Sequence, residues 1–173
     1  MMQHNVYIGL GSNLDNPLIQ VKSAIKEISL NKEIILEAVS GIYQSKALTT
    51  QQDEDYPQQA DYINAVVRVK TNYIPEVLLK VLQSIEQQHN RVKKYRWGPR
   101  SLDLDILLYD DLQLKTKTLT IPHVEIANRN FVLYPLNDIE PALKIPKYGK
   151  LSDILITINK QDLKLLEASP VII

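Results

Sequence analysis

The order in which strand-like and helix-like segments alternate along the first two thirds of the chain is the feature that most constrains its fold. Alternating or β-branched runs predict strands, and apolar residues at intervals of three and four predict helices. We expect strands at Asn5–Leu10, Lys32–Gln44, Asp61–Thr71 and from Asp103, and helices that begin at Asn16–Pro17 and at Pro75. This β-α-β-β-α-β order predicts an α+β, ferredoxin-like sandwich with two helices on one face of a sheet. The other face is then free for a site.

The two helices have clear apolar stripes. Proline is tolerated at the first helical position because its missing N–H would have no partner there. The stripes consist of Leu18, Val21, Ile25 and Ile28 in the first helix, and of Val77, Leu78, Val81, Leu82 and Ile85 in the second. Glycines punctuate the strands: Gly9 and Gly11 are expected to end the first one, and Gly41 indicates a bulge in the second.

The last third of the chain has a less regular pattern, which predicts extra C-terminal elements. Leu119–Pro122 can form a short edge strand, and a one- or two-turn helix is expected over Val124–Arg129, before the apolar run Phe131–Leu136. Ser152 and Asp153 are expected to cap a short helix. The pattern places no element in the tail from Gln161 to Ile173.

Composition limits the class of protein. A length of 173 residues is enough for one domain with a proper core, so we expect a single domain over residues 1–173. Because 20 Lys and Arg balance 20 Asp and Glu, the whole molecule has no basic field for nucleic acid. The absence of cysteine excludes disulfides and thiolate metal sites. No apolar run suggests a membrane span or a signal peptide. We therefore expect a cytoplasmic protein without nucleic-acid or membrane partners. We also expect a monomer, although the neutral charge says nothing about a dimer surface.

A strongly basic segment runs directly into a strand that carries two aspartates. The segment Arg91–Arg100 contains no acid and surrounds the only tryptophan, Trp97, while Asp103 and Asp105 interrupt an apolar strand. Since successive strand side chains point to opposite faces, the two carboxylates share one face, with Cα atoms ~7 Å apart. The opposite face is expected to carry Leu102, Leu104, Ile106 and Leu108.

Two carboxylates at this spacing suit Mg²⁺, which typically takes one or two carboxylates together with substrate phosphates. The adjoining cations suit a polyphosphate, and a pair of metal ions can assist both the attacking and the leaving oxygen of phosphoryl transfer. The residues therefore favour an ATP-using transferase. The alternative is a solvated basic loop before an amphipathic strand, since short motifs carry a risk of false matches.

Several motifs, taken together, resemble a known family. YIGLGSN, DYINAVV, GPRSLDLDILLY, LTIPH and NRNFVLYPL occur in order between about Val6 and Pro141. In this combination they resemble the 6-hydroxymethyl-7,8-dihydropterin pyrophosphokinases of folate biosynthesis. The resemblance implies a ferredoxin-like fold, ATP and Mg²⁺ as co-substrates, and transfer of pyrophosphate to the hydroxymethyl group of the pterin with release of AMP. It also implies in-line attack of the pterin hydroxyl on the β-phosphorus.

The resemblance assigns an ATP side to the site. It implies that Asp103 and Asp105 bridge two Mg²⁺ ions and that Arg91 and Arg100 act with them in catalysis. Guanidinium suits phosphate because it stays charged and can bind oxygens bidentately. The implied ATP-binding residues are Gln83, Glu86, Arg91, Lys93, Arg100, Thr120, His123 and Arg129. For Gln83 and Glu86 a wet helix face, and for His123 a structural role, are the alternatives.

The resemblance also assigns a pterin side. A flat ring with a guanidine-like edge needs aromatic faces and an amide to read its donors and acceptors. The implied substrate-binding residues are Ser45, Leu48, Tyr62, Asn64, Trp97 and Phe131. Tyr62 and Asn64, two positions apart on a strand, face the same way. Ordinary packing is the alternative for this group.

Some positions depart from the family pattern, and two other functions fit parts of the sequence. Ser45-Lys46-Ala47 lacks the usual proline, the following loop is longer and more acidic, and Lys93 replaces a common arginine. A nucleotidyltransferase would share an early Gly11-Ser12 and a later Asp-x-Asp strand, but within one short unit. A non-catalytic RNA-binding module would show a net basic face, which the neutral composition disfavours.

Overall fold

An antiparallel sheet organises the computed structural model, which describes residues 3–47, 59–89, 101–171 and 173 of the chain. Its neighbouring strands run in the order β10-β3-β4-β1-β5, and β2 also pairs with β4. The strands are β1 (His4–Ser12), β2 (Ile34–Val39), β3 (Ile42–Ser45), β4 (Tyr62–Thr71), β5 (Asp103–Tyr109) and β10 (Leu163–Glu167). The expected alternation of strands and helices is confirmed, and the whole is a mixed α/β structure.

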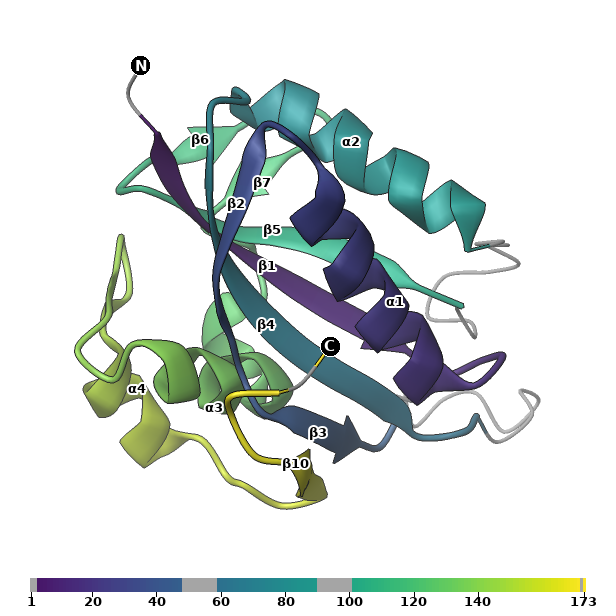
Figure 1. The fold of residues 1–173 in the computed structure, drawn as a ribbon. Helices are drawn as coiled ribbons and strands as arrows, with labels where there is room; N and C mark the ends of the chain where they lie inside the picture. Colours follow the sequence, from purple (N-terminus) through teal and green to yellow (C-terminus); the bar gives the residue numbers. More distant parts are fainter. Residues whose placement is uncertain (1–2, 48–58, 90–100, 172) are drawn as a thin grey trace.

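Helices α1 (Pro17–Leu30) and α2 (Pro75–Gln88) cover one face of the sheet, as Figure 1 shows. Their apolar stripes pack on alternate residues of β1, β4 and β5 to form the larger of two core clusters. Pro17 and Pro75 stand at the start of each helix as expected. One stripe residue differs from the prediction, since Val77 is 38% exposed.

The sequence led us to expect that the opposite face of the sheet is free. This expectation is wrong in part, because α3 (Asn130–Ile139) packs on part of that face. Leu133 and Leu136 of α3 are fully buried against Val66 and Leu108 in the second core cluster. The run Phe131–Leu136, which the sequence left unassigned, therefore lies in helix α3 and supplies its buried residues, Val132, Leu133, Pro135 and Leu136. It leaves open only the end of this face where β4 and β5 carry polar residues.

Three strand details differ from the sequence prediction. Strand β1 does not end at its glycines but continues to Ser12. The segment expected as one strand with a bulge at Gly41 is two strands, β2 and β3, and the register irregularity lies between Leu36 and Ala38. The interruption between β2 and β3 falls at Ser40 and Gly41, where β10 passes close by: a Cβ added at Gly41 would lie 2.8 Å from Leu165 Cδ1.

A bulge in β5 places Leu108 on the opposite face from the one that the sequence predicted. Tyr7 of β1 pairs with Leu108 and Ile8 pairs with Ile106, so one residue, Leu107, is skipped. An extra residue in one strand shifts the alternation of all later side chains. Leu107 and Leu108 consequently both join the second core cluster, whereas Leu104 and Ile106 join the first as expected.

The C-terminal third adds small elements and one strand of the main sheet. These are β6 (Leu114–Lys115), β7 (Thr120–Ile121), the 3-10 helix η1 (Ile126–Asn128), β8 (Lys144–Ile145), β9 (Gly149–Lys150) and α4 (Leu151–Thr157). The short strand, the short helix before α3 and the late helix are confirmed. The late helix begins at Leu151, so Ser152 and Asp153 lie inside it and do not cap it. The unassigned tail forms β10, which pairs with β3.

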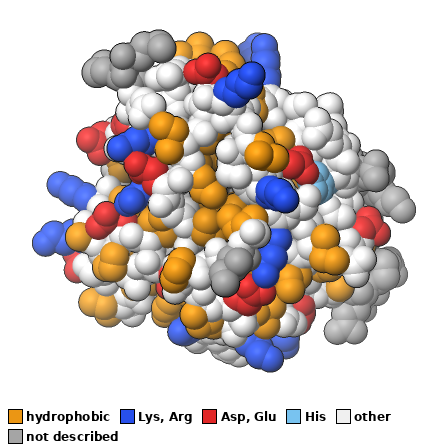
Figure 2. Space-filling model, in the orientation of Figure 1, with side chains coloured by type: hydrophobic (Ala, Val, Ile, Leu, Met, Phe, Trp, Pro, Cys, Tyr) orange, Lys and Arg blue, Asp and Glu red, His pale blue; other side chains and the backbone are white. Residues whose placement is uncertain are grey.

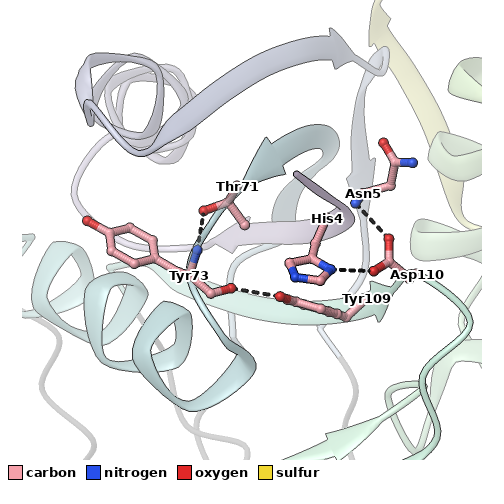
Figure 3. Close-up of polar contacts among 6 residues, drawn as sticks. All are labelled: His4, Asn5, Thr71, Tyr73, Tyr109 and Asp110. Carbon is pink, nitrogen blue, oxygen red and sulfur yellow. Dashed lines mark hydrogen bonds and ion pairs between the residues drawn. The ribbon is translucent and has the colours of Figure 1, made fainter. Parts of the chain in front are cut away.

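A polar clasp joins β1 to the end of β5 (Figure 3). Asp110 accepts a hydrogen bond from the backbone N–H of Asn5 at 2.8 Å, and its second oxygen lies 2.6 Å from Nδ1 of His4. The Tyr109 hydroxyl donates to the carbonyl of Tyr73 at 2.8 Å. Burial raises the pKa of Tyr109 to about 12, so this hydroxyl stays protonated at neutral pH.

Charges of both signs are mixed on the molecular face shown in Figure 2, in keeping with the neutral composition. Among the helices that the structure describes, none is long and apolar enough to cross a membrane.

Candidate active site

A cleft of about 230 Å³ opens beside α3, on the sheet face opposite α1 and α2. Residues of β1, β3, β4 and β5 form its floor, and residues of α3 and of the segment before it form one wall. The lining residues are Gly9, Leu10, Gly11, Ser45, Lys46, Tyr62, Asn64, Ala65, Asp103, Asp105, Leu107, His123, Arg129, Phe131 and Val132.

The two aspartates lie beside two glycines of the neighbouring strand, which we call the glycine floor. In the pairing of β5 with β1, Asp103 is opposite Gly11 and Asp105 is opposite Gly9. A Cβ added at Gly9 would lie 3.3 Å from Leu107 Cδ2, and one at Gly11 would lie 3.4 Å from Asn64 Oδ1. Glycine at these positions therefore keeps the middle of the cleft open. The sequence analysis expected both glycines to end the strand and did not indicate this role.

His123 lies on the wall beside Asp105. Its backbone N–H donates to the Leu107 carbonyl at 2.9 Å, and its ring Nδ1 accepts from the backbone N–H of Glu125 at 3.1 Å. In the neutral ring the other nitrogen, Nε2, then carries the proton. Nε2 lies 4.0 Å from Asp105 Oδ2. Burial lowers the pKa of His123 below its ordinary value, with Arg129 also lowering it and Asp105 opposing the shift.

The far end of the cleft combines an amide, a hydroxyl and two aromatic rings. Asn64 Nδ2 donates a hydrogen bond to Ser45 Oγ at 2.8 Å, and both side chains are buried. Tyr62 and Phe131 line the same cleft. The guanidinium carbon of Arg129 lies 5.7 Å from the centre of the Phe131 ring, within the range of a cation–π contact. Arg129, which can bind an anion, therefore lies next to Phe131, which can bind a flat ring.

The donor set of the cleft fits a hard divalent cation that is shared with a substrate. Asp103 and Asp105 offer carboxylate oxygens on one face, and the side chain of Asp105 is 46% exposed. Within the described part of the chain, no three His, Cys, Asp or Glu side chains gather into a complete metal cage. Mg²⁺ is commonly held by one or two carboxylates with substrate phosphates and water.

The structure thus brings together eight residues that the sequence analysis assigned to the site: Asp103, Asp105, His123, Arg129, Ser45, Tyr62, Asn64 and Phe131. Three others do not line the cleft. Gln83 is exposed on α2, Thr120 lies in β7, and Glu86 is buried, where it accepts the backbone N–H of Leu104 at 3.0 Å.

The remaining predicted residues, Leu48, Arg91, Lys93, Trp97 and Arg100, lie outside the described residues. Seven of the fifteen lining residues were not assigned to the site from the sequence, and Lys46 is the charged one among them. Lys46 borders the cleft and its Nζ lies 3.6 Å from Asp162 Oδ1 of the segment before β10. The missing proline at this position was the signal that could have identified it.

Comparisons with known proteins converge on one family. Residues 7–141 match the family of 7,8-dihydro-6-hydroxymethylpterin-pyrophosphokinase (HPPK). A 2-amino-4-hydroxy-6-hydroxymethyldihydropteridine pyrophosphokinase from Haemophilus influenzae is 42% identical over 166 residues, which are 95% of this chain and 98% of that protein. The enzyme of the same name from Pseudomonas aeruginosa is 41% identical over 154 residues, 89% of this chain and 91% of that one.

Solved structures agree at the level of the fold. The structure of an HPPK-DHPS protein in complex with substrates superimposes on 95% of this chain with a TM-score of 0.70 and 15% identity. The wild-type HPPK-DHPS of Plasmodium falciparum with pterin and p-hydroxybenzoate gives a TM-score of 0.69 over 95% of this chain. The chain spans 47% and 46% of those two proteins, about half of their length.

Proposed function

The chain belongs to the 7,8-dihydro-6-hydroxymethylpterin-pyrophosphokinase family, and on that premise we propose how its cleft performs the reaction. It is an ATP-dependent pyrophosphokinase of folate biosynthesis. The proposal is that the hydroxymethyl oxygen of 6-hydroxymethyl-7,8-dihydropterin attacks the β-phosphorus of ATP in line with the leaving group. A new oxygen–phosphorus bond forms, the bond to the α-phosphate oxygen breaks, and AMP leaves while the hydroxyl proton is lost.

The observation that carries this proposal is the division of one cleft into two chemical halves. Asp103, Asp105 and His123 line the half that suits phosphates and cations, and Tyr62, Asn64 and Phe131 line the half that suits a flat heterocycle. The two halves adjoin over the glycine floor. We propose that the pterin hydroxymethyl group and the ATP β-phosphate meet at this boundary.

Asp103 and Asp105 would hold two Mg²⁺ ions together with ATP phosphate oxygens. When bound, these ions supply neutralisation of the charge on the phosphates and on the departing AMP. The carboxylates do this best from fixed positions, and β5 supplies them because its neighbour β1 pairs with it as far as Gly11, opposite Asp103. Catalysis then rests mostly on positioning and electrostatics, as phosphoryl transfer requires.

His123 and Arg129 would contact the phosphates from the wall of the cleft. The planar guanidinium of Arg129 offers several N–H donors that suit phosphate oxygens. His123 is neutral at pH 7 because its pKa is lowered, and its Nε2–H points to the side of Asp105. It would therefore donate a hydrogen bond to a phosphate oxygen without adding a full charge.

The predicted residues outside the cleft or outside the described ranges keep the roles that the resemblance implies. Arg91, Lys93 and Arg100 would bind phosphates, Gln83, Glu86 and Thr120 would lie near the nucleotide, and Leu48 and Trp97 would contact the pterin.

We also propose a single ferredoxin-like domain over residues 1–173, acting as a monomer in the cytoplasm without nucleic-acid or membrane partners. The strand order β3-β4-β1-β5 with two helices on one face supports that description. Family membership favours pyrophosphate transfer over the nucleotidyltransferase and RNA-binding alternatives.

Product analysis with ATP, Mg²⁺ and 6-hydroxymethyl-7,8-dihydropterin tests the proposed reaction. We expect equal amounts of AMP and pterin pyrophosphate from the wild type, and a loss of at least about a hundredfold in both Asp103→Ala and Asp105→Ala. Asp111→Ala is the matched control, because Asp111 is exposed beyond the end of β5 and outside the cleft. Formation of ADP, or no turnover by folded protein, would contradict the proposal.

A further inference from the structure

Ser45 and Asn64 form a buried pair in the floor of the cleft. Asn64 Nδ2 donates to Ser45 Oγ at 2.8 Å, and the two residues are 4% and 5% exposed, respectively. Among the described residues, Ser45 is the one hydrogen-bond partner of the Asn64 side-chain amide. The serine hydroxyl is therefore the group that holds the asparagine amide in place.

The backbone around this pair is held on both sides. Ser45, in β3, pairs with Tyr62 of β4 on one side and with Leu163 of β10 on the other. Asn64 lies between Tyr43 of β3 and Gly11 of β1. Strand pairing on two sides fixes the Cα positions of both residues, so their side chains have few ways to separate. The C-terminal strand β10, which the sequence pattern did not predict, is part of this support.

The hydrogen bond determines what the amide can offer to a ligand. An asparagine amide has two N–H donors and a carbonyl oxygen with two lone pairs. Ser45 takes one N–H, which leaves the second N–H and Oδ1 for a ligand. Oδ1 lies toward the open floor, since a Cβ added at Gly11 would be 3.4 Å from it. A ring edge with an adjacent donor and acceptor would complement these two groups.

We propose that Ser45 is a positioning residue whose hydroxyl holds the Asn64 amide ready for the pterin edge. This inference rests on the proposed function. The family resemblance implied pterin contacts from backbone groups near Ser45, whereas the positioning role belongs to its side-chain hydroxyl. Without the hydroxyl, the amide loses its buried partner and can rotate away from the floor, so that binding must reorder it.

Binding of the pterin, measured by its fluorescence with a non-hydrolysable ATP analogue and Mg²⁺, tests this role in a double-mutant cycle. We expect Ser45→Ala to weaken pterin binding about tenfold, the size of one hydrogen bond, and Ser45→Thr to restore it. In the Asn64→Ala background, Ser45→Ala should cause no further loss, because its effect passes through Asn64. KM for the pterin should rise in Ser45→Ala while kcat changes less than about twofold.

Gln44→Ala is the control for the cycle. Gln44 adjoins Ser45 on β3, points to the other side of the strand and bonds to Asp61 at 2.7 Å. Multiplicative losses in the double variant, or wild-type binding by Ser45→Ala, would overturn the positioning role. A wild type that binds the pterin but forms no product would refute the proposed reaction and leave the positioning role standing. A wild type that binds no pterin would refute both.

Discussion

At the scale of single residues, the cleft depends on polar groups whose partners are fixed by the backbone. His123 is held by a bond from its own N–H to Leu107 and by a second bond from Glu125 to Nδ1. Glu86 is buried and holds the start of β5 through the N–H of Leu104. His123 was assigned to the site from its motif, but Glu86 was expected to bind ATP or to lie on a wet helix face, and its burial outside the cleft was not predicted. The contacts that orient the two residues have no signal in the local sequence.

His123 gives a prediction for the pH dependence of stability in the metal-free protein. Its pKa in the folded state lies below its ordinary value of 6.5, because burial disfavours the charged ring. Below about pH 6.5 the unfolded chain therefore binds more protons at this residue than the folded chain, and stability falls as pH decreases toward the lowered pKa. His123→Asn removes this loss and keeps an acceptor for Glu125.

The free energy of unfolding in denaturant, measured for wild type and His123→Asn between pH 7.5 and pH 5, checks this sign. We expect the wild type to lose more stability than the variant on acidification. A wild type that gained stability relative to the variant as the pH fell would show that the charged ring is favoured in the folded state.

At the scale of elements, strands β1 and β5 set the shape of the cleft. Alternation correctly placed Asp103 and Asp105 together, because they precede the bulge. It failed at Leu108, because one skipped residue reverses the faces beyond it. The break at Gly41 and the strand β10 were missed for a related reason, since both depend on a pairing between segments far apart in the sequence.

The glycine floor yields a prediction at this scale. Gly11→Val adds a branched side chain beside Asn64 and Tyr62, into the space over the floor. Because β-branched residues suit strands, we expect a change of less than about 1 kcal/mol in the free energy of unfolding. Pterin binding should weaken by at least about tenfold, with Gly11→Ala intermediate. Fluorescence titration of the pterin measures the effect, and undiminished binding by folded Gly11→Val would show that the ring does not lie over Gly11.

At the scale of the whole molecule, the two faces of the sheet differ: one is covered by helices, and the other carries the cleft. Helices α1 and α2 bury the first face, and their positions followed from periodicity alone. On the second face α3 buries half and leaves the cleft. The sequence pattern of Phe131–Leu136 is too short and too apolar to distinguish a strand from a helix, so its packing on the sheet could not be predicted. The family motifs identified cleft residues in the sequence. The pairing of β3, β4, β1 and β5 explains why these residues lie close together.

A crystal structure with Mg²⁺, a non-hydrolysable ATP analogue and the pterin tests the central claim, that one cleft holds both substrates, most directly. The account predicts the pterin between Tyr62 and Phe131 with its edge on Asn64, and the analogue's phosphates beside Asp103, Asp105 and His123. The hydroxymethyl oxygen should face the β-phosphorus at the boundary between the two halves. Either ligand bound outside this cleft, or metal ions held without the two aspartates, would contradict it.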